Sequence, residues 1–285
     1  MQSSVFWLIS SAWRSIPVLW TRAMAAADRR YLWMSGVAAV LIVSVVAAVW
    51  HRDPLHQDLM VALAPPSLGF PFGTDHLGRD VFARLFHALP RSIGIATAAM
   101  AVAAFFGTSA GLIAAASNRL VDGALMRLTD LALAFPGLLL AMVLAGLMGG
   151  GTMPVLLGIA LAQWPQFARM TRTIAATVLT EAHIEASRLA GLAEWRILLR
   201  QVMPRVLSQI MALATLGVGG AVLTISSLGF LGLGLQPPTP EWGAMITELL
   251  PHMDVAPMQI AAPCIALFLT VLACMAAGRQ LAEAR

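Results

Sequence analysis

Lysine is missing from this chain of 285 residues, so all 18 of its cationic side chains are arginine. Charge of either sign is scarce as well: charged residues make up 11% of the sequence, whereas hydrophobic residues make up 59%. The mean hydropathy of +0.80 is far from that of a soluble globular chain. The phosphate-binding loop of ATP-hydrolysing enzymes needs a lysine, so this chain does not carry such a loop.

Cysteine is almost absent. Cys264 and Cys274 lie in one apolar run, ten residues apart, and no straight helix could join them by a disulfide. We interpret both as small buried hydrophobic residues. The net charge of +4 does not indicate nucleic-acid binding, because the arginines flank apolar runs and no basic patch is interleaved with aromatic residues.

Runs without charge predict membrane-spanning helices, since about 20 apolar residues are needed to cross roughly 30 Å of hydrocarbon. Five such runs cover residues 31–50, 92–117, 131–168, 206–240 and 255–278. The third is too long for one span, and residues 149–154 at its centre, with three glycines and a proline, have the composition of a turn. The sequence therefore predicts an all-α integral membrane protein with six spans.

Arginine is distributed unevenly between the segments that join these spans. With the N-terminus inside, fourteen of the 18 arginines lie on the cytoplasmic side, which retains positive charge during insertion. Both termini are therefore expected in the cytoplasm. The predicted parts are a cytoplasmic interfacial segment (residues 1–30), a first transmembrane helix (31–50), a periplasmic loop (51–91), a five-helix core (92–278) and a cytoplasmic tail (279–285).

The cytoplasmic loop between the fourth and fifth spans carries the most specific pattern. Glu185, Ala186 and Ser187 are followed by Gly191 and then by Pro204. A glycine can take the left-handed conformation that ends a helix, and proline is favoured where a helix begins. We therefore expect two short helices hinged at Gly191, with the fifth span beginning near Pro204.

This pattern resembles the signature loop of permease subunits of binding-protein-dependent, ATP-driven importers, in which Glu-Ala-Ala is followed by Gly and then by Leu-Pro. Gln201 and Met203 stand where isoleucine and leucine are usual, and Ser187 is a mild departure. Residues 73–80, 130–136 and 227–243 extend the resemblance to the second permease subunit of dipeptide, oligopeptide and nickel importers.

The resemblance implies the type I importer permease fold and a coupling helix within residues 172–204 that docks on a cytoplasmic ATPase. Glu185 is the expected polar contact, while Arg188 and Gly191 fix the docked geometry. The implied partners are a homologous second permease subunit, two ATPase subunits or domains, a periplasmic solute-binding protein and membrane lipid. ATP and magnesium bind in the ATPase partners, so this chain holds no cofactor and is not an enzyme. Peptides, nickel and metal chelates are all open as substrates.

The outer loops hold several weaker candidates. Asp75, Arg79 and Asp80 are expected to form ion pairs and to cap the second span, and the spacing of the histidines in residues 51–91 does not favour a metal site. Asp130 is expected to pair with Arg127, one turn away. Four further residues are candidates for an outer gate or a binding-protein contact, with an ordinary surface turn as the alternative: Pro237, Pro238, Glu241 and Trp242.

Two other classes of membrane protein fit the sequence less well. An intramembrane enzyme needs a Ser/His or paired-aspartate constellation at membrane depth, and none is visible. An autonomous channel needs a selectivity filter, and it leaves the loop around Gly191 unexplained. A proton- or sodium-driven transporter is also disfavoured, because no ionisable residue lies in the middle of a predicted span.

Overall fold

A computed structural model of the chain describes residues 52–283. The predicted interfacial segment and first span therefore lie outside the described residues. Secondary structure in residues 52–283 is helical, apart from an isolated bridge between Thr74 and Asp80. The elements are η1 (Leu59–Val61), α3 (Val81–Ala116), α4 (Arg119–Ala134), α5 (Gly137–Leu147), α6 (Thr152–Leu179), α7 (Ala182–Leu189), α8 (Glu194–Ile197), the π-turn η2 (Leu198–Val202), α9 (Met203–Phe230), α10 (Trp242–Leu249), η3 (Leu250–His252) and α11 (Pro257–Glu283).

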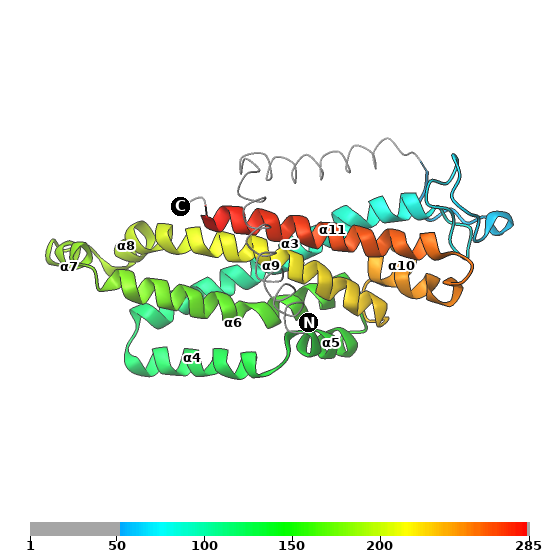
Figure 1. Ribbon diagram of the computed structural model, residues 1–285. Coiled ribbons are helices and arrows are strands. Elements are labelled where there is room, and N and C mark those ends of the chain that lie inside the picture. Colours follow the sequence, from blue (N-terminus) through cyan, green and yellow to red (C-terminus); the bar gives the residue numbers. More distant parts are fainter. Residues whose placement is uncertain (1–51, 284–285) are drawn as a thin grey trace, which may run out of the picture.

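The long helices α3, α6, α9 and α11 run side by side, as Figure 1 shows. The short helices α7 and α8 lie at one end of this bundle, which we name the coupling end. The segment of residues 52–80 and helix α10 lie at the opposite end, which we name the loop end. The chain thus separates its two groups of predicted functional residues by the full length of the bundle.

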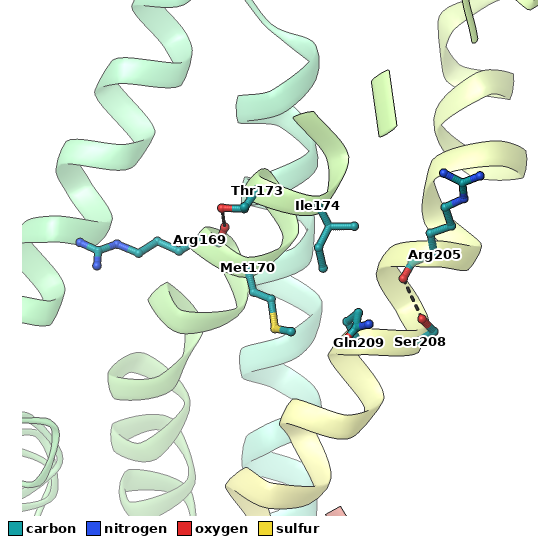
Figure 2. Close-up of a pocket in the computed structure, with 7 residues that line it drawn as sticks. All are labelled: Arg169, Met170, Thr173, Ile174, Arg205, Ser208 and Gln209. Carbon is teal, nitrogen blue, oxygen red and sulfur yellow. Dashed lines mark hydrogen bonds between the residues drawn. The ribbon is translucent and has the colours of Figure 1, made fainter. Parts of the chain in front are cut away.

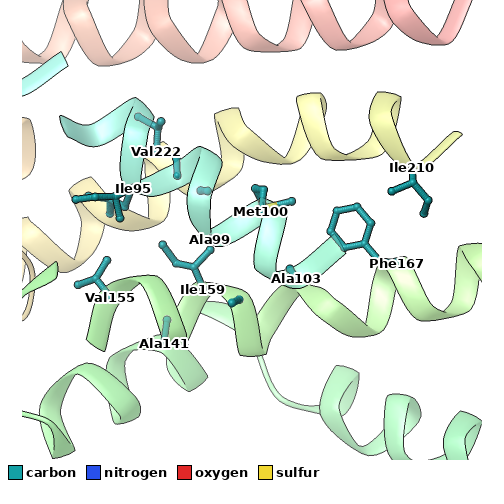
Figure 3. Close-up of a cluster of buried hydrophobic side chains, with 14 of the residues drawn as sticks. Ile95, Ala99, Met100, Ala103, Ala141, Val155, Ile159, Phe167, Ile210 and Val222 are labelled. Atoms are coloured by element: carbon teal, nitrogen blue, oxygen red, sulfur yellow. The ribbon is translucent and has the colours of Figure 1, made fainter. Parts of the chain in front are cut away.

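The core forms where α3 crosses α6 and α9. Figure 3 shows Ile95, Met100 and neighbouring alanines of α3 against Ile159 and Phe167 of α6, with Val222 of α9 beside them. Lipid tails are as apolar as these side chains, so close packing rather than exclusion of water holds spanning helices together. The small side chains of α3 are what permit this close packing.

Two glycines set the approach of α3 to α6. A Cβ atom on Gly107 would lie 2.4 Å from the backbone carbonyl oxygen of Trp164, and one on Gly111 would lie 2.4 Å from that of Ala168. Any larger residue would force the helices apart, so the Gly-xxx-Gly spacing is required by packing.

The third apolar run folds differently from the expectation. Its predicted turn is present, since Gly149, Gly150 and Gly151 all have positive φ. However, the first arm is broken between α4 and α5, which meet at 83°, and α5 has only 11 residues. Pro136 explains the break, because proline lacks an N–H and disfavours the helical conformation of the residue before it.

Three helices of the described part are long and apolar enough to cross a membrane: α3, the continuous helix of α8, η2 and α9 (Glu194–Phe230), and α11. The bent pair α4–α5 makes a fourth if it is one span. Helix α6 is long enough but is not among them, because Gln163, Pro165 and Gln166 interrupt its apolar run. The count of six spans stays a prediction.

The cysteines on α11 differ from their interpretation as buried residues. Cys264 is exposed and Cys274 is half-buried, and both are free thiols. In the most apolar part of α11, only 6% of the residues are buried within this chain. This helix therefore turns most of its surface outward, toward lipid or another subunit.

Candidate functional site

The coupling end consists of a short connection between two long helices. Helix α6 ends at Leu179 and α9 begins at Met203, so residues 180–202 form the connection and the predicted loop boundaries of 172–204 overlap both helices. Helix α7 projects beyond the rest of the bundle in Figure 1, and α8 lies beside the end of α6. Among the described residues, the outer surfaces of α7 and α8 are largely exposed.

Gly191 forms the turn between α7 and α8, as predicted. Its φ is +79°, and the N–H of Leu192 donates to the carbonyl of Ser187 while the N–H of Gly191 donates to that of Arg188. This pair of hydrogen bonds is the Schellman motif, which satisfies the last carbonyls of a helix and requires a left-handed residue. The sequence signal and the local geometry therefore agree at this glycine.

Buried apolar side chains attach α7 to the helix that follows it. Ile184 of α7, Ile197 of α8 and Val202 of η2 are each fully buried. Arg188 bonds Glu194 across the turn at 2.8 Å and lies 3.5 Å from Glu185. These contacts hold the two short helices in one fixed arrangement.

The predicted coupling residues lie on the outer side of this arrangement. Glu185 and Ala186 are exposed, and the Glu185 side chain is 66% exposed. The sequence pattern did not single out four large apolar side chains of residues 189–199 that are exposed: Leu189, Leu192, Trp195 and Leu199. A large exposed aromatic next to leucines is the composition of a protein-binding surface, so Trp195 carried a signal that was overlooked.

Pro204 lies in the first turn of α9, as expected, but α9 is not separate from the helix that precedes it. The helix is continuous from Glu194 to Phe230, and the π-turn η2 lies immediately before α9. In this turn the N–H of Met203 donates to the carbonyl of Leu198, five residues back. The turn precedes a residue that lacks an N–H, so it absorbs the interruption that proline causes in a regular helix.

A cluster of four charges, three of them buried and the fourth half-buried, holds the loop end. Asp75 accepts hydrogen bonds from Arg79 at 2.7 Å and from Arg84 at 2.5 Å, and Glu248 of α10 lies 2.7 Å from both guanidinium groups. The ion pairing predicted for Asp75 and Arg79 is confirmed, and Asp80 caps α3 as expected. Arg84 and Glu248 were not predicted, because their role depends on α10, which is distant in sequence.

The arginines determine the charge of Asp75. Burial raises the pKa of the Asp75 carboxyl, but the charges of Arg84 and Arg79 and the hydrogen bonds from Arg79 more than offset this effect. The pKa of Asp75 therefore lies below its ordinary value, and the carboxylate is charged at neutral pH.

One of the outer histidines lies beside this cluster. Asp75, His76 and Glu248 bring a ligand atom each within 4.8 Å of one another, which the sequence spacing did not indicate. However, two guanidinium groups already bond the carboxylates and would repel a metal ion. We therefore assign no metal site to these residues.

Two of the candidate outer-gate residues are buried. Glu241 is 0% exposed, caps α10 through the N–H of Ala244 and accepts a hydrogen bond from Ser226 at 2.9 Å. Burial raises the pKa of its carboxyl. Trp242 is 1% exposed and donates from Nε1 to the carbonyl of Leu85 at 3.0 Å. In this conformation neither side chain is exposed to another protein, and their assignment to an outer gate or a binding-protein contact stays a prediction.

The other two gate candidates, Pro237 and Pro238, are exposed on the segment between α9 and α10. They remain available to a partner at the loop end.

A cleft of about 710 Å³ lies between α6 and α9. In Figure 2 the side chains of Met170 and Ile174 point toward α9, while the guanidinium of Arg169 points away from it. Arg169 pairs with Asp130, so the expected pairing of Asp130 with Arg127 is wrong. The second arginine of the cleft, Arg205, pairs with Glu181. Both cations have partners outside the cleft, so its lining offers no free charge.

Comparison with known proteins gives similar sequences over most of the chain. The family described as "Binding-protein-dependent transport system inner membrane component" matches residues 107–281. The glutathione transport system permease protein GsiD of Pectobacterium atrosepticum is 37% identical over 219 residues, which are 77% of this chain and 73% of that protein. The di/tripeptide transport system permease protein DppC of Pseudomonas aeruginosa is 36% identical over 238 residues, covering 81% and 78%.

Among solved structures, an inward-facing form of the MetNI methionine ABC transporter aligns with a TM-score of 0.52 and 18% sequence identity. The alignment covers 69% of this chain and 95% of that chain. At this identity the match concerns the fold alone, and it agrees with an all-helical arrangement of the type I importer permease.

Proposed function

Because the chain belongs to the family of binding-protein-dependent transport system inner membrane components, we propose that it forms half of a translocation pathway and transmits ATP-driven movement to it through α7. The other half comes from a homologous permease subunit, and ATP is hydrolysed in two ATPase subunits or domains. A periplasmic solute-binding protein delivers the substrate. This chain contributes no catalytic group and holds neither ATP nor magnesium.

The surface of α7 and α8 is the single observation that carries the coupling role. Its exposed groups combine a carboxylate, Glu185, with the apolar side chains of Leu189 and Trp195. An exposed apolar patch with a charged rim is typical of a protein interface. Because buried contacts fix α7 to the long helix Glu194–Phe230, a partner that moves this surface moves that helix as well.

The bundle end that holds α7 is assigned to the cytoplasm and the loop end to the periplasm, which follows the asymmetry of arginine. The membrane is the bacterial inner membrane. Residues 92–278 form the permease core, and the exposed Pro237 and Pro238 lie where a periplasmic binding protein would dock.

Peptides, including glutathione, are the proposed substrate class, since GsiD and DppC are named for these substrates. Nickel and metal chelates are the alternative cargo.

Charge reversal at Glu185 tests the coupling role. Glu185→Arg places a cation where the proposed interface holds an anion, so co-purification with the cognate ATPase should fall by at least about tenfold while membrane insertion is unchanged. Uptake of labelled dialanine and of labelled glutathione into proteoliposomes should fall with it.

The matched control is Asp254→Arg, which reverses an exposed charge at the loop end. It should leave ATPase association at the parent level. Parental association and uptake in the Glu185→Arg variant would refute the assignment of α7 as the coupling surface.

A further inference from the structure

Two polar side chains connect α7 to the π-turn. Gln201 of η2 and Ser187 of α7 are 14 residues apart in sequence, and Gln201 Nε2 donates to Ser187 Oγ at 3.0 Å. Both side chains are half-buried between the two elements. They are also two of the three positions at which this loop departs from the resemblance described above.

The hydroxyl of Ser187 extends this contact to the backbone. A hydroxyl has one hydrogen, and its shorter contact is with the carbonyl of His183 at 2.9 Å, compared with 3.3 Å to Gln201 Oε1. The amide of Gln201 therefore donates to Ser187, which in turn donates to His183. Hydrogen bonds in such a chain polarise and strengthen one another.

The direction of Gln201 depends on the π-turn. A π-turn adds one residue to a helical turn, and each residue of a helix turns the side chain by about 100°. Side chains after η2 therefore point in directions rotated by about 100° from those they would have in a regular helix continued from α8. Two other ion pairs link this region to the long helix: Arg188 of α7 with Glu194, and Glu181, the N-cap of α7, with Arg205. Both join exposed groups and are screened by water and salt.

We propose that Ser187 and Gln201 are a positioning pair that fixes the angle between α7 and the long helix Glu194–Phe230. The angle decides how far movement of α7 is passed on to that helix. This inference rests on the coupling role proposed for α7. It adds two residues that touch neither ATP nor substrate but set the geometry of coupling.

Four variants test the pair. Ser187→Ala leaves the half-buried amide of Gln201 without its acceptor, and Gln201→Leu removes the donor to Ser187. The double variant S187A/Q201L replaces both groups by apolar ones, which avoids leaving one half-buried polar group without its partner. Ser187→Thr keeps the hydroxyl and serves as the conservative control.

Two measurements report the angle between α7 and the long helix and the effect of that angle on coupling. Spin labels at the exposed positions Leu189 and Leu207, in a chain whose two cysteines are alanine, report the distance between α7 and α9 in nanodiscs. ATP hydrolysis of the complete complex, with and without its binding protein, reports coupling. Each single alteration should broaden the distance distribution and reduce binding-protein stimulation by about fivefold, whereas the double variant and Ser187→Thr should stay within about twofold of the parent.

The results separate the pair from the coupling role itself. Parental distances and stimulation in both single variants, or a loss in the double variant equal to the product of the single losses, would overturn the positioning pair. In either case ATPase association persists, and the proposed function stands if Glu185→Arg abolishes that association. If Glu185→Arg binds the ATPase as the parent does, the proposed function fails whatever the spin labels show.

Discussion

Gly191 illustrates what a single residue contributes at the coupling end. A Cβ atom added there would meet nothing within 4 Å, so space does not explain the glycine. Its φ of +79° does, because a side chain in the left-handed region contacts its own backbone. The Schellman hydrogen bonds at this turn depend on that conformation.

Gly191→Ala should therefore cost roughly 1 to 2 kcal/mol of local stability and should speed amide exchange throughout α7. Hydrogen exchange of the purified chain measures this effect. Gly94→Ala is the matched control, since its Cβ also meets open space but the residue lies within α3. This control should be neutral or stabilising by up to about 1 kcal/mol. Equal exchange in the parent and Gly191→Ala would show that the turn does not need glycine.

Some residues could be predicted from sequence because their signals are local. Asp80 precedes a helix it caps, and Gly191 ends one, so neighbouring residues suffice to indicate both roles. Glu241 is different: its burial depends on Ser226 and on the docking of α10, which the sequence does not reveal. The Ser187–Gln201 contact was invisible for a related reason, since it requires the register set by the π-turn.

Among the elements, α10 and the segment of residues 52–80 owe their position to the cluster of Asp75, Arg79, Arg84 and Glu248. Arg84 is 1% exposed and joins Asp75 to Glu248 of α10. Removing one member of a buried ion pair leaves a charge without compensation, which is far more costly than losing a surface pair.

Asp75→Asn should destabilise the loop end by roughly 3 to 5 kcal/mol, because both arginines lose a charged partner. The stability of the parent protein should also depend on pH, because the charge of Asp75 contributes to it. The folded-state pKa of Asp75 is lowered, so the stability it contributes is complete above its unfolded pKa of about 4 and is lost as pH falls through the folded value.

Thermal unfolding in detergent between neutral pH and strong acid measures both effects on Asp75. Asp53→Asn is the control, since Asp53 is exposed and its hydrogen bonds within residues 52–283 are to neighbouring backbone. An Asp75→Asn variant as stable as the parent at neutral pH would contradict the role given to the cluster.

The break between α4 and α5 could not be predicted by counting apolar runs alone. The third run was counted by the absence of charge, and Pro136 within it was not weighed. Proline after Phe135 is a sequence signal for the end of a helix, so this break was predictable in principle. The angle of 83° was not, because it depends on how α5 packs against α6.

For the whole molecule, orientation in the membrane is the property that arginine counting predicts. Cysteines introduced at the exposed positions Gln57 and Pro238 should react with an impermeant reagent from outside, and those at Ser117 and Glu194 only from inside. The reversed pattern of labelling would contradict cytoplasmic placement of the coupling end. A variant with both native cysteines replaced by alanine supplies the background.

The uninterrupted helix from Glu194 to Phe230 gives the molecule a rigid rod of 37 residues, which is about 55 Å long. Trp195 lies near one tip of this rod, and Ser226 near the other bonds Glu241, the cap of α10. A tilt of about 5° around the midpoint carries each tip roughly 2 Å, in opposite directions. A displacement of Trp195 therefore moves Ser226 and the bonded Glu241 by rotation of one helix. No chain of side-chain rearrangements between the two ends is needed.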